Sequence, residues 1–146
     1  MLNLFVAGNP APQGSKRHVG GGVLVDSCKR LPDWRKDVRA ACLDADGQPK
    51  TRFEGAVLLH LEFVLPRPKS LPKTKPTPPH TKKPDLDKLT RAIGDAMTSA
   101  GVFRDDSHIV FGTRHKRYAE LGEVTGVNIM ADEFRGGHSL NRSLPQ

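Results

Sequence analysis

The sequence predicts an α+β domain, a single mixed β-sheet of about four to five strands with two helices packed on it. Residues 56–65 alternate apolar side chains at period two, which is typical of a strand that buries one face. Residues 32–43 and 85–100 repeat apolar side chains at the i, i+3, i+4 spacing of amphipathic helices. Short apolar segments before and after these three supply the remaining strands, and helices laid on a sheet give the α+β class.

The length of the chain fits one domain. Its 146 residues can bury one modest core, and no apolar run approaches the length of a membrane span. We expect a folded domain over residues 1–131 and a flexible tail over 132–146, which is rich in Gly, Ser, Asn and Arg. Cys28 and Cys42 have no metal-ligand spacing and make no disulfide framework. The sequence therefore predicts a soluble protein of a reducing cytoplasm.

Two short strands and a helix are expected in the first part of the chain. The elements are a strand over 2–7, a loop over 8–18 that ends in basic residues, a glycine turn at 20–22, a brief strand over 23–25 and the helix over 32–43. Pro32 suits the start of that helix, and Trp34, Val38 and Cys42 recur every four residues on its apolar face.

The second part of the chain carries the clearest strand and the second helix. The elements are a strand over 56–65, a loop over 66–84, the helix over 85–100, a turn at 105–107 and strands over 109–118 and 123–130. The loop holds seven prolines and six Lys or Arg residues, which predicts an extended basic segment within the domain. Gly101 suits the end of the helix.

The basic charge favours a polyanionic partner. The net charge is +7 and the isoelectric point is about 9.7. Lys and Arg that neutralise phosphates release condensed counterions, which stabilises binding to nucleic acid. The residues expected to contact backbone phosphates are Lys16, Arg17, Lys73, Lys75, Lys82, Lys83, Arg114 and Lys116.

Acidic residues gather beside the most basic loop. Asp85, Asp87 and Asp95 lie on the second helix, and Asp105 and Asp106 follow about ten residues later. Each has an ordinary explanation when it is taken alone: an N-cap, a helix-dipole partner, an i, i+4 charge ladder through Arg91, or a turn.

Taken together, these acids point to a metal. Carboxylates repel phosphodiesters, so a surface that only binds DNA would avoid them. Mg²⁺ reverses this repulsion, because it is held by one or two carboxylates together with a substrate phosphate. The bound ion polarises the phosphoryl group and activates water, and a cation such as Arg91 stabilises the charge that develops. Acids surrounded by bases are what metal-assisted phosphodiester hydrolysis requires.

The pattern resembles the RusA family of Holliday-junction resolvases. The resemblance lies in Asp85-Leu86-Asp87 at a helix start, the basic Arg91, Asp95, and the pair Asp105-Asp106 before a strand. The segment 8–17, with its Pro, Gly and basic residues, is similar to the family's N-terminal segment. The motifs PDLDKL at 84–89 and PQGSKR at 12–17 look most like those of RusA-like proteins carried by phages. The resemblance implies a RusA-like fold, a homodimer, and a bacterial or infected-host cytoplasm.

The resemblance also implies roles for single residues. Asp85, Asp87 and Asp106 fall on the family's catalytic, metal-binding acids, and Arg91 falls on its catalytic lysine. The last is a departure, because Arg stays charged whereas Lys can release a proton. Lys88 stands where the family usually has Asn, and it is the nearest substitute for a proton-transferring lysine. Asp105, Asp95 and Lys88 are expected to support the site.

The sequence thus predicts a magnesium-dependent, structure-selective endodeoxyribonuclease that acts on branched DNA such as four-way junctions, with Mn²⁺ as a possible substitute ion. One alternative is a non-catalytic basic DNA-binding protein with acidic helix caps. Another is a module in which the acids hold a cation only for stability. The nuclease interpretation requires the acids of 85–106 to converge in the folded chain.

Overall fold

The structure, a computed structural model, describes residues 1–14, 16–18, 24–26 and 28–136. Its centre is a four-stranded mixed sheet with the strand order β1-β6-β4-β5. The strands are β1 (Leu2–Ala7), β4 (Val57–Leu65), β5 (Ile109–Tyr118) and β6 (Gly126–Glu133). β4 runs parallel to β5, whereas β6 runs antiparallel to both β4 and β1.

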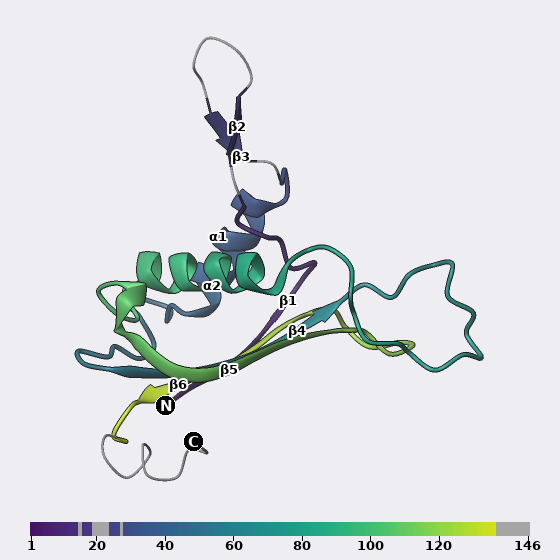
Figure 1. The fold of residues 1–146 in the computed structure, drawn as a ribbon. Coiled ribbons are helices and arrows are strands. Elements are labelled where there is room, and N and C mark those ends of the chain that lie inside the picture. The colour runs from purple at the N-terminus through teal and green to yellow at the C-terminus, as the bar shows by residue number, and fades with distance from the viewer. Residues whose placement is uncertain (15, 19–23, 27, 137–146) are drawn as a thin grey trace, which may run out of the picture.

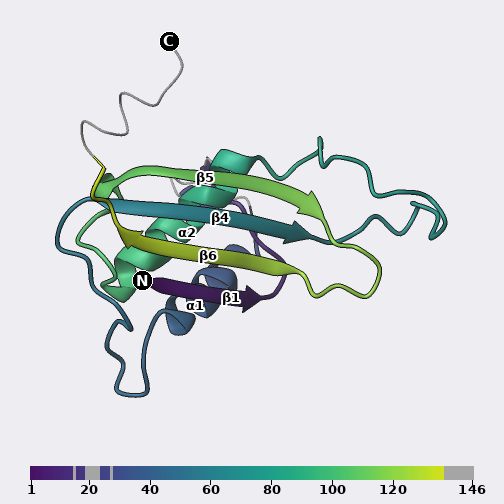
Figure 2. The same cartoon turned by 90° about the horizontal axis from the view of Figure 1, so that it is seen from below.

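Two helices cover one face of the sheet and leave the other face open (Figures 1 and 2). They are α1 (Leu31–Ala41) and α2 (Leu86–Ala100). This architecture confirms the predicted α+β class with one mixed sheet and two helices. Neither helix of the described chain has the length and apolar character needed to cross a membrane.

The core lies between the sheet and the helices. Alternate residues of β4 supply its sheet side, as their period-two spacing predicts: Val57, Leu59, Leu61, Phe63 and Leu65 are all buried. The apolar stripe of α2 faces them with Leu89, Ile93 and Met97, none of which is exposed to solvent. The two helices also pack on each other, so α2 is fixed on two sides and only its remaining face is free to carry polar residues.

Helix boundaries follow the predicted stop and start signals. α1 begins one residue before Pro32 and has Cys42 as its C-cap. α2 begins directly after Asp85, which is its N-cap, and ends at Gly101, whose φ of 84° lies in the left-handed region. Glycine adopts this conformation without the steric cost that a Cβ would add.

The predicted loop over residues 8–18 is wrong at its basic end. Lys16–His18 forms a short strand, β2, which pairs antiparallel with β3 (Leu24–Asp26). β3 lies one residue later than the predicted strand over 23–25. Three-residue strands have too little periodicity to be recognised in a sequence, and only their pairing defines them. The predicted glycine turn at 20–22 lies outside the described residues.

The last strand begins and ends three residues later than the predicted range of 123–130. Glu123 belongs instead to the β5–β6 connection, where its carboxylate accepts two hydrogen bonds from Arg117 at 2.6 and 2.7 Å. β6 then continues to Glu133, within the range predicted for the tail, and the Phe134 N–H donates to the Ala56 carbonyl at 2.9 Å. The flexible tail stays a prediction, since residues 137–146 are not described.

Candidate metal and nucleic-acid site

The first turn of α2 presents a carboxylate that does not cap the helix. Asp85 has the extended backbone of an N-cap residue, with φ −72° and ψ 142°, yet its side chain accepts no hydrogen bond from the helix. The carboxylate is about half exposed, at 48%, and its ion pair in the described chain is with Lys88, at 3.6 Å. The capping explanation therefore holds for the position of Asp85 and not for its side chain, which remains available to a ligand.

Asp87 and Arg91 occupy the exposed face of the same helix. Positions four residues apart are neighbours on a helix surface. Both side chains are exposed, and neither takes part in an ion pair within the described residues. Asp95, one turn further on, is half-buried and also makes no such pair there. The charge ladder that would give these residues a purely structural role is not formed.

The acidic pair that precedes β5 lies against the middle of α2. Its residues belong to a short 3₁₀ helix, η1 (Asp106–His108), with Asp105 as N-cap. A Cβ placed on the buried Gly94 would lie 3.5 Å from the Asp106 Cβ, which is an ordinary van der Waals distance, so Asp106 lies directly beside the helix at Gly94.

The two acids of this pair have different environments. The Asp105 carboxylate accepts the Ser107 N–H at 3.2 Å, which is the turn role that the sequence allows for it. Hydrogen bonds from Ser107 lower the pKa of Asp105 below its ordinary value. Asp106 is exposed and makes no side-chain hydrogen bond within the described chain, so it is the member of the pair with a free carboxylate.

The predicted convergence of three acids is absent from the described residues. No group of three His, Cys, Asp or Glu side chains in this part of the protein is placed to hold a metal. Asp106 lies at the level of Gly94, which is seven residues and therefore about 10 Å along the helix axis from Asp87. Asp85 and Asp87 thus lie at one end of this face and Asp106 at the other, with Arg91 between them.

The donor chemistry nevertheless fits a hard cation. The free carboxylates of Asp85 and Asp87 supply oxygen ligands at the start of α2. Mg²⁺ commonly uses only one or two protein carboxylates and completes its octahedron with water and phosphate oxygens. Two adjacent acids that neither cap the helix nor pair fully with bases match that requirement. A third ligand from Asp106 would need movement of η1 or of α2.

Lys116, which the sequence analysis expects to contact a backbone phosphate, makes contacts within the protein. It lies on β5 beside Phe63 of β4, on the helix side of the sheet. Its ammonium group donates to the carbonyls of Lys82 at 2.6 Å and Pro84 at 2.8 Å. Lys116 therefore fastens the segment directly before Asp85 to the sheet. Period-two alternation places Lys116 on this face, but it does not show that the loop returns to it.

An aromatic contact strengthens the same attachment. The ring of His80, which is buried, packs against Tyr118 of β5 at a centroid distance of 4.2 Å, with the two ring planes tilted by 34°. Burial and the nearby Lys116 lower the pKa of His80 below its ordinary value, so the ring is neutral at physiological pH. Sequence reasoning missed His80, because an isolated histidine in a proline-rich loop has no periodic signal.

The remaining basic residues differ in their location and in their exposure to solvent. Lys73, Lys75, Lys82 and Lys83 are exposed on the long loop, which extends from one end of the sheet (Figure 2). Arg67 organises this loop by donating to Thr77 at 2.6 Å and to two backbone carbonyls. Arg114 is exposed on the edge strand β5. Lys16 and Arg17 lie on β2, and their side chains are outside the described part of the structure.

The fold and the site define a class of protein, a small basic α+β domain with free carboxylates at the start of a helix. The model of the family described as endodeoxyribonuclease RusA matches residues 7–130. The chain belongs to the RusA family of endodeoxyribonucleases. No curated protein matches the chain.

Proposed function

We propose that this protein is a magnesium-dependent endonuclease that resolves Holliday junctions or other branched DNA. The observation that carries the proposal is the pair of carboxylates, Asp85 and Asp87, that do not cap the helix at the start of α2 in a chain of the RusA family. These acids lie beside the long basic loop, where carboxylates oppose DNA binding unless a cation lies between them and the phosphate.

Each residue of the site then has a specific task. Asp85 and Asp87 hold the ion, and Asp106 joins them after a movement of η1 or of α2. Asp105 and Asp95 support these acids, and Lys88 restrains Asp85 through their ion pair. When bound, Mg²⁺ polarises the phosphoryl group and makes hydroxide available near neutral pH. The Arg91 guanidinium, free of ion pairs in the described chain, forks onto the phosphate and stabilises its developing charge. Mn²⁺ takes the place of Mg²⁺ with the same oxygen ligands.

The protein is proposed to act as a homodimer. A four-way junction has approximate two-fold symmetry, so an isologous dimer presents one site to each of two opposed strands. Contacts with the DNA are made mainly to its backbone, which positions the substrate and gives selectivity for shape rather than base sequence.

The decisive test removes one metal ligand. Asp87→Asn keeps the size of the side chain and removes its charge, so we expect junction binding to remain nearly intact while cleavage in magnesium stops. The assay uses a labelled four-way junction and a matched linear duplex, each with magnesium or with EDTA. Wild type should cut the junction in paired, symmetrical positions and only with magnesium.

The control variant is Asp46→Asn. Asp46 is an exposed acid in the turn after α1, and Pro49 of that turn contacts Gly101 at the opposite end of α2. This variant should cleave like wild type. Undiminished cleavage by Asp87→Asn would refute the assignment of Asp87.

A non-catalytic DNA-binding protein is the second candidate function. The lack of a three-acid group among the described residues favours it. It predicts salt-sensitive junction binding, no cleavage and no effect of magnesium. The third possibility, a purely structural cation, predicts a large rise in melting temperature with magnesium and no cleavage.

A further inference from the structure

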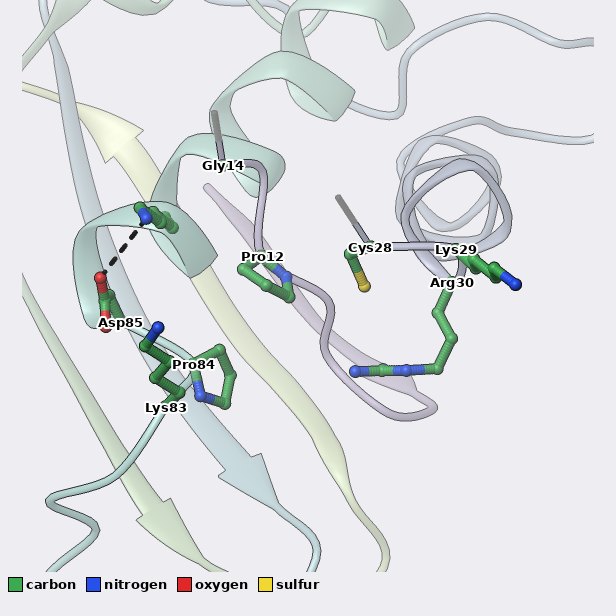
Figure 3. Close-up of a pocket in the computed structure, with 9 residues that line it drawn as sticks. Pro12, Gly14, Cys28, Lys29, Arg30, Lys83, Pro84 and Asp85 are labelled. Atoms are coloured by element: carbon green, nitrogen blue, oxygen red, sulfur yellow. Dashed lines mark ion pairs between the residues drawn. The ribbon is translucent and has the colours of Figure 1, made fainter. Parts of the chain in front are cut away.

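A basic pocket opens beside Asp85 (Figure 3). Its volume is about 510 Å³, and it lies between the N-terminal loop, the turn before α1 and the start of α2. Four of the residues that line it are cationic: Lys29, Arg30, Lys83 and Lys88. Asp85 is its acidic residue. The Lys29 side chain points away from Asp85 (Figure 3), so segments distant in the sequence bring three cations, Arg30, Lys83 and Lys88, to the pocket beside one proposed metal ligand.

The walls of this pocket are joined by backbone contacts. The Gln13 N–H donates to the Lys88 carbonyl at 3.0 Å, which ties the N-terminal loop to the first turn of α2. The Arg30 guanidinium donates to the Asn9 carbonyl at 2.8 Å and holds the same loop from the α1 side. The pocket is therefore built into the fold, and Arg30 contributes to its wall as well as to its charge.

One lysine of the pocket is free to bind an anion. Lys83 is exposed and makes no ion pair within the described residues, whereas Lys88 pairs with Asp85. On the β5 side of Asp85, by contrast, the Lys116 ammonium is occupied by two carbonyls. The uncommitted lysine beside Asp85 is thus on the pocket side (Figure 3).

We propose that this pocket binds a backbone phosphate of the DNA strand next to the phosphate held at Asp85 and Asp87. The inference rests on the proposed function, because it places the strand relative to that site. A strand is continuous, so a phosphate at Asp85 brings its neighbour within reach of the pocket. The Asp85 carboxylate repels a free anion in the pocket. A phosphate of bound DNA is instead held near the pocket by the rest of the strand, so its binding does not depend on the pocket alone. The strand path then runs from α2 toward α1.

The first test pairs a lysine variant with a neutral phosphate. Lys83→Gln should lower the slope of log K against log salt by about one, the loss of one phosphate contact. A junction with one methylphosphonate beside the cut position should weaken the binding of wild type more than the binding of Lys83→Gln. Lys50→Gln is the control, since Lys50 is an exposed lysine that does not line the pocket. Equal methylphosphonate effects in wild type and Lys83→Gln would overturn the proposal.

The second test measures access to the pocket by chemical modification of Cys28 and needs no cleavage of DNA. Cys28 lines it and is partly exposed, whereas Cys42 is buried and its burial raises the pKa of the thiol to about 11. Iodoacetamide should therefore modify Cys28 alone in the native protein, as counted by mass spectrometry. Saturating junction in EDTA should slow this modification severalfold. Unchanged modification, or equal protection by inorganic phosphate alone, would overturn the DNA assignment.

The two proposals fail in different ways. Wild-type protein that neither binds nor cuts branched DNA would overturn both. Wild-type protein that cuts junctions, with normal binding by Lys83→Gln and unprotected Cys28, would overturn only the pocket assignment.

Discussion

At the scale of single residues, the acids of 85–106 differ in whether their carboxylates hydrogen-bond to the backbone. Asp105 accepts a hydrogen bond from the backbone of η1, so the turn accounts for its presence. Asp85 occupies a capping position without capping, and Asp87 and Asp106 have free carboxylates in the described chain. The second group lacks a structural explanation, which is why we assign the metal to it.

Another acid is committed to structure and gives a prediction on stability. Glu123 accepts hydrogen bonds from Arg117, which lower its pKa from 4.5 to about 2. Because the folded-state pKa is the lower one, this stabilisation is complete above about pH 4.5 and is lost as the pH falls through about 2. The stability difference between wild type and Glu123→Gln should therefore shrink over that range, as measured by urea unfolding.

The control for this prediction is Glu54→Gln. Glu54 pairs with Arg52, but its side chain is 80% exposed and solvent screens the pair. We expect little effect of this substitution at any pH. A constant gap between wild type and Glu123→Gln from neutral pH to about pH 2 would contradict the role of the Arg117 pair.

At the scale of elements, three segments place the site: α2, η1 and the end of the long loop. Packing on the sheet and on α1 fixes α2, and contact at Gly94 fixes η1 against it. The loop end is fixed by Lys116 and by the packing of His80 against Tyr118. The position of Asp85 therefore depends on β5, a strand that lies about thirty residues later in the chain.

This dependence predicts the effect of Lys116→Met. Without the two carbonyl contacts, the segment before Asp85 is less restrained, and we expect the magnesium concentration for half-maximal cleavage to rise by about tenfold. Junction affinity in EDTA should change little. Lys116→Arg keeps donors at this position and should restore part of the metal affinity.

A different result would support the phosphate contact that the sequence analysis predicts for Lys116. A fall in junction affinity with an unchanged magnesium requirement would identify it as a phosphate contact. Both quantities come from one titration series, in which cleavage is followed against magnesium and binding is followed in EDTA.

At the scale of the whole molecule, helices cover one face of the sheet and the other stays open (Figure 1). Two phenylalanines are exposed on that open face, Phe5 at 45% and Phe111 at 37%. A single chain also presents a single set of the proposed acids. Cutting two opposed strands of a junction therefore calls for two chains, which is the reason for the proposed homodimer.

Mixed dimers test this arrangement. Wild type combined with Asp87→Asn, unfolded and refolded together, should contain dimers with one active site. Such dimers should nick one strand of a four-way junction, whereas wild type cuts two. Labels on both opposed strands separate the products. Mixtures that yield only paired cuts and uncut DNA, in proportion to the wild type present, would argue that each chain acts alone.

The sequence by itself determined the fold class, the helices and strands of the main sheet, and the residues that carry the proposed chemistry. Period-two and helical spacing express burial directly, so β4 and α2 were predictable from Val57, Leu59 and Ile93. The motif around Asp85 also sufficed to indicate the family, which the match over residues 7–130 confirms.

Tertiary structure alone decided how the site is assembled. Local patterns carry no information on contacts between residues far apart in the chain. Such contacts are the hydrogen bonds of Lys116, the approach of Asp106 to Gly94 and the pocket beside Lys83. The start of β6 was unpredictable because Glu123 is held in the β5–β6 connection by its hydrogen bonds to Arg117, a side-chain pair that period-two alternation does not reveal. Propensity acts over a few neighbouring residues, whereas these contacts depend on how whole elements pack.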